Sequence, residues 1–411
     1  METQPYQVRA VHCDHRASDE EVYQALKRAT APLARSWEKL KAARRIAIKF
    51  NQDWGKQPPM FQGMFSALVS EKVARATLRL LRENTSAELF AVDVSFFQAY
   101  EGARPGTTTW LKPVFDEFGV EFVEANHSGI TPVEVPGGGL MFRRYWLPRC
   151  ILEADELISV QKMKNHGFMG ITLTLKNLFG LMPTEPEGRP RHYYHHLVRM
   201  PYMLADIARI YNPALNILDA LTSQAGQEWD YGADKQYVTD ALVAGDHCVA
   251  TDALGSTLMG HDPNADWLTP PYHRDRNTLK VAAEAGFGTV DLSQVDYQTE
   301  VTGPLAPFFA HITDPRSRVI SWRRTTAEQA LFYRDHRKEI VDRYAGEYVL
   351  IQQNEVRWHD PSGRLRVSRR QIAGADPDQA LWFKYVDPDE AEGENYDVYE
   401  KTLADIRARG L

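Results

Sequence analysis

The run Arg45-Ile-Ala-Ile-Lys-Phe-Asn51 decides the fold class, because it is short, rich in apolar residues and followed by polar ones, as a buried strand is. A helical pattern follows over 71–83, with apolar side chains on one face. A second strand is predicted over 88–94, a helix over 111–118 and a third strand over 120–125. This β-α-β-α-β order predicts an α/β fold with a mostly parallel, doubly wound sheet.

Later segments extend this pattern and then change character. The predicted elements are a loop or hairpin over 132–140, a strand over 154–160, a helix over 202–210, strands over 215–219 and 241–246, a helix over 248–259 and a loop over 263–276. We expect residues 1–300 to form an α/β body in two lobes, about 1–150 and 151–300. A small α+β module is predicted over 320–411, with a helix over 326–344, a hairpin over 347–358 and a solvated acidic loop over 388–397.

The composition bounds the class of protein. The 411 residues include 48 Lys and Arg against 55 Asp and Glu, a net charge of -7, which argues against nucleic acid as the main partner. Cys13, Cys150 and Cys248 form no CxxC pair, so we expect neither a disulfide framework nor a cysteine-bound zinc or iron–sulfur cluster. Because residues 1–15 are polar and no apolar run reaches about 18 residues, we expect no secretion signal, no membrane span and a cytoplasmic protein.

A second run, 162–180, is unusually rich in groups that bind ligands or transfer protons. Its candidate residues are Lys162, Lys164, His166, Thr172, Lys176 and Asn177, with Gly167, Gly170 and Gly180 among them. The run follows a predicted strand, and ligands of open α/β sheets bind beyond the carboxyl ends of the strands. From Gly170 onward we expect a helix on which Thr172 and Lys176 share a face, where burial would lower the pKa of the lysine. The alternative is that the lysines are solvated and the threonines pack.

The same run resembles the family known as domain of unknown function 362 (DUF362), whose members show a Lys-x-His, Gly-x-Thr and Lys-Asn-Leu-Phe-Gly pattern. The matching positions are Lys164-Asn-His166, Gly170-Ile-Thr172 and Lys176-Asn-Leu-Phe-Gly180. Further matches, spread over about 45–290, are Ile48-Lys-Phe-Asn51, Asn216-Ile-Leu-Asp219, Val243-Ala-Gly-Asp246 and Ala250-Thr-Asp-Ala253. Phe50 and His247 stand where the family pattern has proline. Many relatives carry a ferredoxin-like cysteine cluster, and since this chain has none, we do not expect their electron-transfer role here.

A more distant similarity is to nickel-pincer lactate racemases, which also place a histidine and a lysine ten residues apart around a turn rich in Gly and Thr. His166 and Lys176 have this spacing. In those enzymes the lysine carries the cofactor and histidines shuttle the substrate proton, but Thr174-Leu175 replaces their Gly-Gly before the lysine. The stretch 336–349 resembles a small helix–hairpin unit of other uncharacterised proteins.

The densest histidine cluster is Arg189-Pro-Arg-His192-Tyr-Tyr-His195-His196. His192 and His196 have the i, i+4 spacing of paired metal ligands on a helix. Alternatively, the cluster supplies an acid, a base or an anion site together with Arg189 and Arg191, or it is an ordinary surface cluster.

Lys49 and Asn51 end a predicted strand. They either bind a carboxylate or phosphate of the ligand or are solvated.

Several acidic and aromatic residues remain as candidates. Asp93 ends a predicted strand and would bind a cation, cap the following segment or orient Lys49. Asp219 ends another predicted strand and has the better claim to a functional role, as a ligand of a cation. Asp252 is expected to be the N-cap or a dipole partner of the helix that it opens. His12-Cys-Asp-His15 has a metal-like composition but lies outside the family match. The aromatic residues near the predicted loops favour a partly apolar organic substrate unless they belong to the core: Trp54, Phe61, Phe96, Phe97, Tyr100, Tyr193 and Tyr194.

Together these features predict an enzyme that acts on a small carboxylate or hydroxy acid by Lys/His proton transfer, as an isomerase, epimerase or lyase. The catalytic residues would be Lys176, His166 and His192; the substrate would be held by Lys49, Asn51, Lys162, Lys164, Thr172, Asn177, Arg189 and Arg191; an assisting divalent metal would be bound by Asp93, Asp219 and His196. Such a substrate fits a biosynthetic pathway, and a homodimer is one assembly that we consider. The alternative is a non-catalytic accessory protein that carries a cofactor or metal for a partner enzyme.

Overall fold

One large sheet forms the centre of the computed structural model, which describes residues 4–53, 58–95, 109–184, 189, 191–228, 235–362, 372 and 380–411. The strand order is β13-β1-β12-β11-β9-β2-β5-β6, with β10 beside β9. Their bounds are β1 Tyr6–His12, β2 Arg45–Phe50, β5 Glu88–Asp93, β6 Glu121–Glu124, β9 Glu156–His166, β10 Gly170–Thr172, β11 Leu215–Ala225, β12 Lys235–Gly245 and β13 Val295–Thr299.

The sheet is mostly parallel, which confirms the predicted α/β class. Strands β11, β9, β2, β5 and β6 run parallel to one another, whereas β12 is antiparallel to both β11 and β1. Because β2 pairs with β9, with Lys49 opposite Ser159, the sheet continues without a break across the boundary expected near residue 150. The two expected lobes therefore share one sheet.

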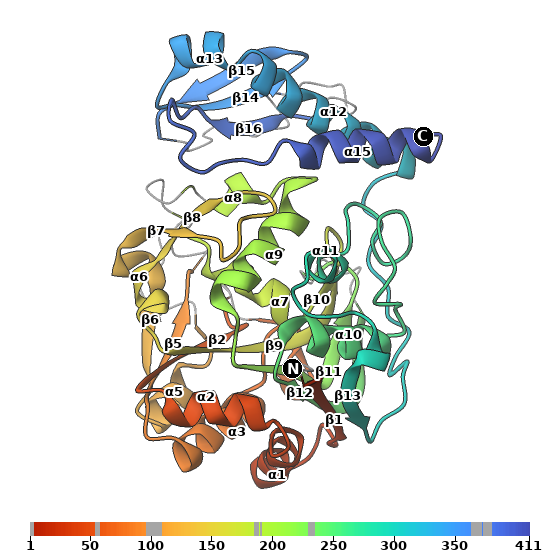
Figure 1. Cartoon of the computed structure of the whole chain (residues 1–411). Coiled ribbons are helices and arrows are strands. Elements are labelled where there is room, and N and C mark those ends of the chain that lie inside the picture. The colour runs from red at the N-terminus through yellow and green to blue at the C-terminus, as the bar shows by residue number, and fades with distance from the viewer. Residues whose placement is uncertain are drawn as a thin grey trace.

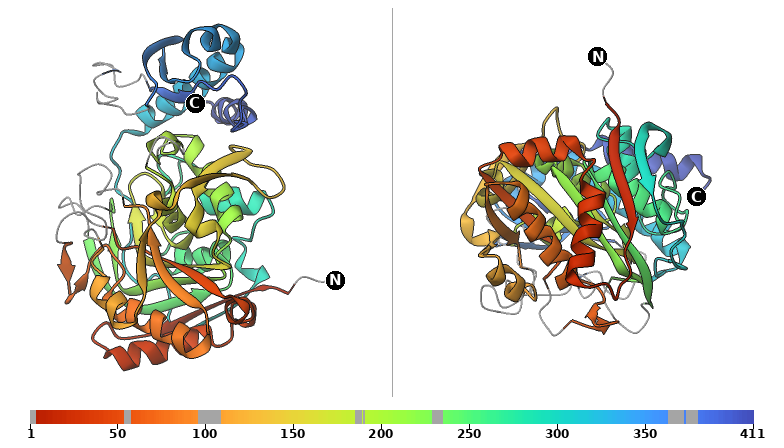
Figure 2. Two further views of the ribbon diagram at one scale, coloured as in Figure 1. Left: turned by 90° about the vertical axis from the view of Figure 1, so that its left-hand side faces the viewer. Right: turned by 90° about the horizontal axis from the view of Figure 1, so that it is seen from below.

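Helices cover both faces of this sheet, as alternation along its strands requires. Ile46 and Ile48 face the core that contains α1, α2, α3 and α5, whereas Ala47 faces the core that contains α7, α9, α10 and α11. Figures 1 and 2 show α1 to α3 beneath the sheet and α7, α9, α10 and α11 above it. The bounds are α1 Asp19–Thr30, α2 Ala34–Ala42, α3 Glu71–Asn84, α5 Lys112–Glu117, α7 Thr174–Asn177, α9 Arg199–Tyr211, α10 Cys248–Leu258 and α11 Thr278–Glu284.

Smaller elements complete the body. They are β3 Met60–Phe61, β4 Met64–Phe65, β7 Ile130–Glu134, β8 Arg144–Pro148, α6 Arg149–Leu152, α8 Arg191–Tyr194 and the 3-10 turns η1 Ala125–Ser128, η2 Leu178–Leu181 and η4 Leu292–Gln294. The predicted loop or hairpin over 132–140 is confirmed, because β7 and β8 pair antiparallel.

Within the described ranges, no helix combines the length and the apolar character needed to cross a bilayer.

The segment around 170 differs from the prediction. Strand β9 extends to His166, and Ile171 and Thr172 form β10, paired with Asn165 and Lys164. Gly170, at φ +80°, sits at the end of the tight connection, where a residue without Cβ avoids strain. The predicted helix that carries both Thr172 and Lys176 is therefore wrong: the helix begins at residue 174, after a β-hairpin.

The C-terminal module sits above α8 and α9 in Figure 1. It has an antiparallel sheet in the order β15-β14-β16, and its described residues also include the helices α12, α13 and α15. Their bounds are α12 Arg316–Asp335, α13 Arg337–Tyr344, β14 Tyr348–Gln352, β15 Glu355–Asp360, β16 Trp382–Tyr385 and α15 Asp397–Ala408. The single helix predicted over 326–344 is instead two helices that meet at His336.

The acidic stretch 388–397 was predicted to be a solvated loop, and this prediction is wrong for its central residues. Glu392 and Glu394 are buried, since Lys384 forms ion pairs with both of them. Arg199 of α9 donates to Glu394 at 2.9 Å and to the Phe383 carbonyl at 3.0 Å, which joins the module to the body. The cations of neighbouring elements, rather than water, compensate these carboxylates.

Candidate functional site

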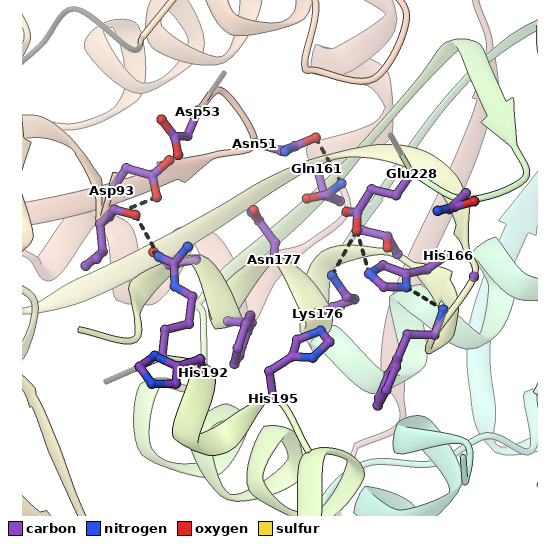
Figure 3. A pocket seen from close by; sticks show the side chains of 18 of the residues that line it. Asn51, Asp53, Asp93, Gln161, His166, Lys176, Asn177, His192, His195 and Glu228 are labelled. Atoms are coloured by element: carbon purple, nitrogen blue, oxygen red, sulfur yellow. Dashed lines mark hydrogen bonds and ion pairs between the residues drawn. The ribbon is translucent and has the colours of Figure 1, made fainter. Parts of the chain in front are cut away.

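A pocket of about 800 Å³ opens where β2, β5 and β9 approach their carboxyl ends (Figure 3). Nine of the predicted site residues line it: Lys49, Asn51, Asp93, His166, Thr172, Lys176, Asn177, Arg191 and His192. The remaining lining includes Asp53, Gln161, Phe168, Phe179, His195, Gln227, Glu228, Arg274 and Thr313. The location agrees with the general rule for ligand sites in open α/β sheets.

Glu228 is the centre of the polar network in this pocket. One carboxylate oxygen lies 2.6 Å from His166 Nε2 and 3.3 Å from Lys176 Nζ, and the other lies 3.3 Å from Lys164 Nζ. Burial raises the pKa of Glu228, but these three groups outweigh burial and hold its pKa well below the ordinary value. The residue is therefore a carboxylate at neutral pH.

The two ring nitrogens of His166 have distinct roles. Nδ1 accepts hydrogen bonds from the backbone N–H groups of Phe168, at 2.9 Å, and Met169, at 3.2 Å. The proton of the neutral ring must then reside on Nε2, which donates to Glu228. Burial lowers the pKa of His166 to about 4, although Glu228 opposes this shift. This geometry makes His166 a neutral donor that positions Glu228.

Lys176 reaches the pocket from the first helical residues after the hairpin. Burial lowers the pKa of Lys176, and Glu228 acts in the opposite direction. Behind it, Lys164 donates to the Ala67 carbonyl at 2.8 Å, and burial lowers its pKa to about 8. Two lysines and one histidine thus surround a single carboxylate, which creates a local excess of proton donors.

Asp252 fixes the helix that carries Lys176. It accepts hydrogen bonds from the Thr174 backbone N–H, at 2.9 Å, the Thr174 hydroxyl, at 2.6 Å, and the Leu175 N–H, at 2.8 Å. Asp252 lies inside α10 and caps α7, so the prediction that it caps its own helix is wrong. This buried carboxylate accepts hydrogen bonds from N–H groups at the start of α7 that have no partner within that helix. It thereby holds α7 and α10 together.

A second ion pair lines the other end of the pocket. Lys49 Nζ lies 2.9 Å from Asp93 Oδ2 and donates to the Phe50 carbonyl at 2.7 Å. Burial raises the pKa of Asp93 to about 6, while Lys49 lowers it. A Cβ at Gly180 would lie 2.5 Å from Lys49 Cε, so glycine makes room for this pair.

Two amide side chains tie strand ends together. Asn177 Nδ2 donates to the Lys49 and Val160 carbonyls, both at 3.1 Å, and to the Ser159 hydroxyl at 3.0 Å. Gln161 Nε2 donates to Asn51 Oδ1 at 3.1 Å. The –NH₂ group of Asn177, which we expected to hold substrate, is thus engaged in joining β2 to β9.

The hydroxyl of Thr172 gives independent support for a ligand. Thr172 is 2% exposed and lines the pocket, and its Oγ1 has no hydrogen-bond partner among the described residues. Buried polar groups in folded proteins almost always have a partner, and a buried orphan indicates a missing one. A ligand oxygen or nitrogen beside Thr172 would supply it.

The other predicted residues are not among the described lining of the pocket. Lys162 donates to the Thr222 hydroxyl at 2.9 Å and lies 3.4 Å from Asp219, which accepts the Ser70 N–H at 2.7 Å. Arg189 lies 3.2 Å from Glu392 of the C-terminal module. His196 is buried beside the Leu197 carbonyl. Lys162, Asp219, Arg189 and His196 therefore contact other parts of the fold and do not line the pocket.

The donor set of the pocket does not fit a divalent metal. Asp93 is bound by Lys49, and Asp219 by Lys162, so their oxygens face cations. Asp93, Asp219 and His196 do not meet: among the described residues, the one cluster of three ligand types within 4.8 Å is Asp14, His15 and Asp240, where Arg16 binds Asp14.

The ring-bearing residues of the pocket differ from those that we expected. Tyr193 and Tyr194 are buried in the core against Phe142, and Trp54, Phe96, Phe97 and Tyr100 lie outside the described residues. The rings that line the pocket are instead Phe168, Phe179, His192 and His195, and His192 stacks on Phe383 of the module at 5.4 Å.

Arg191 donates to the Val94 carbonyl at 2.6 Å and to the Gly180 carbonyl at 2.9 Å, so it stabilises the wall of the pocket.

Sequence reasoning missed Glu228 and Arg274. Glu228 follows β11 by three positions, after Gly226-Gln227, and its φ of +87° is strained for a residue with a Cβ. An acidic residue beyond a strand end was the available signal, but the predicted strand ended at residue 219. The extra length of β11 carries the chain to the pocket.

Three comparisons with known proteins place this chain. Residues 46–257, just over half of the chain, match a family model described as "Domain of unknown function (DUF362)". A thylakoid-associated protein of Synechocystis sp. is 27% identical over 127 residues, covering 30% of this chain and 38% of that protein, so the chain spans well under half of its relative. The chain is also similar to the lactate racemase apoprotein from Thermoanaerobacterium thermosaccharolyticum, at 16% identity and a TM-score of 0.37, over 62% of this chain and 56% of that chain.

Proposed function

The chain belongs to the DUF362 family, whose description names no activity, and we propose from the pocket itself that the protein is an enzyme that moves a proton on an organic carboxylate. The reaction is an isomerisation, epimerisation or elimination at the carbon beside a carboxylate or carbonyl. Lys176 is the catalytic residue, and Glu228 is its charge partner. His166 and Lys164 are positioning residues that act through Glu228.

The proton steps follow from the contacts of Lys176. Its neutral amine removes a proton from substrate carbon: the C–H bond breaks, an N–H bond forms, and the electron pair moves toward the adjacent carbonyl or carboxylate. Glu228 then lies within 3.3 Å of the resulting ammonium and stabilises it. Return of the proton to another carbon completes an isomerisation, and its return to the opposite face of the same carbon completes an epimerisation. In an elimination, the electron pair forms a C=C bond while a neighbouring group leaves with the electrons of its own bond.

One observation carries this proposal: a half-buried lysine and a buried carboxylate share a pocket in which the Thr172 hydroxyl has no hydrogen-bond partner among the described residues. Burial lowers the pKa of Lys176, which raises the fraction of neutral amine near pH 7. The cations of the pocket, Lys49, Arg191 and Arg274, favour a substrate with negative charge.

Deuterium exchange tests the proposal without knowledge of the product. Wild-type protein is incubated in D₂O with a panel of 2-hydroxy, 2-oxo and unsaturated carboxylates, and exchange at the carbon beside the carboxylate is followed by NMR. We expect exchange with at least one substrate class, and a loss of at least about 100-fold in Lys176→Met, as general-base catalysis contributes roughly 10²–10⁴-fold.

The control is Lys41→Met, which removes an exposed lysine of α2. Both variants should melt within a few degrees of the wild type. Full exchange activity in folded Lys176→Met would contradict the proposal, and so would binding of a panel member without any exchange in the wild type.

A further inference from the structure

We propose that the substrate of this pocket is a planar, conjugated organic anion, considerably larger than a simple hydroxy acid. The inference rests on the proposed function and names the class of substrate. It comes from a row of ring and guanidinium side chains that line the pocket, Arg191, Phe179, His195, Phe168 and Arg274.

Each member of this row contacts the next. The Arg191 guanidinium lies 5.7 Å from the Phe179 ring, which lies 5.7 Å from the His195 ring. His195 lies 4.7 Å from Phe168, over which the Arg274 guanidinium lies at 4.8 Å. The row therefore runs without interruption from one guanidinium to the other.

The opposite side of the pocket is polar. In Figure 3, His192 and His195 lie below the cavity, whereas Asp53, Asn51, Gln161 and Glu228 lie above it, with Lys176 and His166 between. A ligand in this space has rings on one side and hydrogen-bonding groups on the other. A flat ring system satisfies both, since one face stacks while substituents at its edge meet Lys176 and Thr172.

The size of the pocket excludes a good fit for a very small substrate. Its volume of about 800 Å³ lies in the upper part of the range, about 300–1,000 Å³, that encloses drug-sized ligands. A hydroxy acid with a handful of heavy atoms would leave most of this space to water and would not contact both Phe168 and Phe179.

The two guanidinium groups add a charge preference. Arg274 lies 3.1 Å from Asp314 and 3.3 Å from the Thr313 hydroxyl, and its buried Nε has no hydrogen-bond partner among the described residues. Guanidinium groups both stack on flat rings and bind carboxylates, so they suit an aromatic acid at either end of the row.

Calorimetric titration with a matched pair of probes tests this inference. The probes are 2-naphthoate and its saturated analogue decahydro-2-naphthoate, which have the same carbon count and charge but differ in planarity. Lactate is the small reference. We expect 2-naphthoate to bind roughly tenfold more tightly than the saturated acid, the size of effect that one or two ring contacts give.

The variants Phe168→Leu and Phe179→Leu keep an apolar side chain but remove the rings, and each should reduce the preference for 2-naphthoate to a few-fold. Tyr297→Leu is the control, because it removes an exposed ring from the edge strand β13. Its preference should equal that of the wild type.

The outcomes separate this inference from the proposed function. Equal affinity for the two bicyclic acids, or binding of lactate alone, overturns the planar substrate and leaves the anion pocket intact. Failure of all three probes to bind overturns the planar anion as well, whereas the proposed proton transfer is decided separately by the deuterium exchange. A preference that survives in both Phe→Leu variants shows that the ring row does not select the ligand, and it also overturns the inference.

Discussion

Nε2 of His166 lies 2.6 Å from a carboxylate oxygen of Glu228, while Nδ1 of the same ring accepts two backbone N–H groups. Both nitrogens are therefore engaged, and the ring cannot turn without breaking hydrogen bonds. Histidine in such a pocket would ordinarily be regarded as an acid or base near neutral pH. Here the backbone of the hairpin assigns the proton to Nε2 and turns the residue into a fixed donor.

The first prediction concerns the protonation state of His166. Because burial lowers its pKa to about 4, the ring should stay neutral from pH 5 to 8, with hydrogen on Nε2. Nitrogen-15 NMR of histidine-labelled protein measures both properties, and the signal is assigned by its absence in His166→Asn. A cationic ring at pH 6, or hydrogen on Nδ1, would contradict the assigned hydrogen bonds.

The second prediction concerns the charge that Glu228 provides. Glu228 raises the pKa of Lys176 against the effect of burial, so Glu228→Gln should lower that pKa further. Trace acetylation followed by mass spectrometry measures the pH at which Lys176 reacts. The half-reaction pH should fall in the variant, while the exposed Lys41 reacts as before. An unchanged curve for Lys176 would exclude coupling between the two residues.

The third prediction concerns the space at Gly180. In Gly180→Ala the new methyl would lie 2.5 Å from Lys49 Cε and 3.3 Å from Asp93 Oδ1, and the Lys49–Asp93 pair must shift. Overpacking of this kind should lower the free energy of unfolding by about 1–3 kcal/mol. Urea unfolding measures it. Gly167→Ala is the control, since its methyl meets no atom closer than 3.4 Å. Equal stability of the two variants would contradict the close contact.

The fourth prediction concerns the attachment of the C-terminal module. Arg199 is fully buried and pairs with Glu394, so Arg199→Met leaves a carboxylate with one cation fewer and removes one donor from each of two carbonyls. The expected loss is about 3–5 kcal/mol in the free energy of unfolding. Arg334→Met breaks exposed ion pairs to Asp335 and Glu400 and should cost less than about 1 kcal/mol. Similar losses in both variants would contradict a buried junction.

Local patterns were sufficient for β2, β5, β6, β9, β11 and β12 of the main sheet, but not for β1, β10 and β13, and for part of the pocket. The strand that begins at Arg45 has an apolar interior and a polar end, and its last residues Lys49 and Asn51 line the pocket as the position of strand ends in α/β folds predicts. The pattern around Lys176 placed it correctly in a helix that follows a strand. Such features depend on neighbours within a few residues.

Other features depend on residues far apart in sequence. Glu228 meets Lys176 across 52 positions, and Asp252 meets Thr174 across 78, so no local pattern links them. Thr172 was assigned to a helix because it stands four residues before Lys176, but pairing of β10 with β9 overrides that preference. The buried state of Glu392 likewise depends on Lys384 and Arg189, which no acidic run by itself reveals.

Strand β9 has a consequence for how this pocket can change during evolution. Side chains alternate along a strand, so Lys162, Lys164 and His166 share one face of the sheet. Loss or gain of one residue between them would turn part of this set toward the opposite core, with charges among apolar side chains. Evolution can therefore change this pocket by substituting single residues, whereas an insertion or deletion within β9 would place charged side chains in the opposite core.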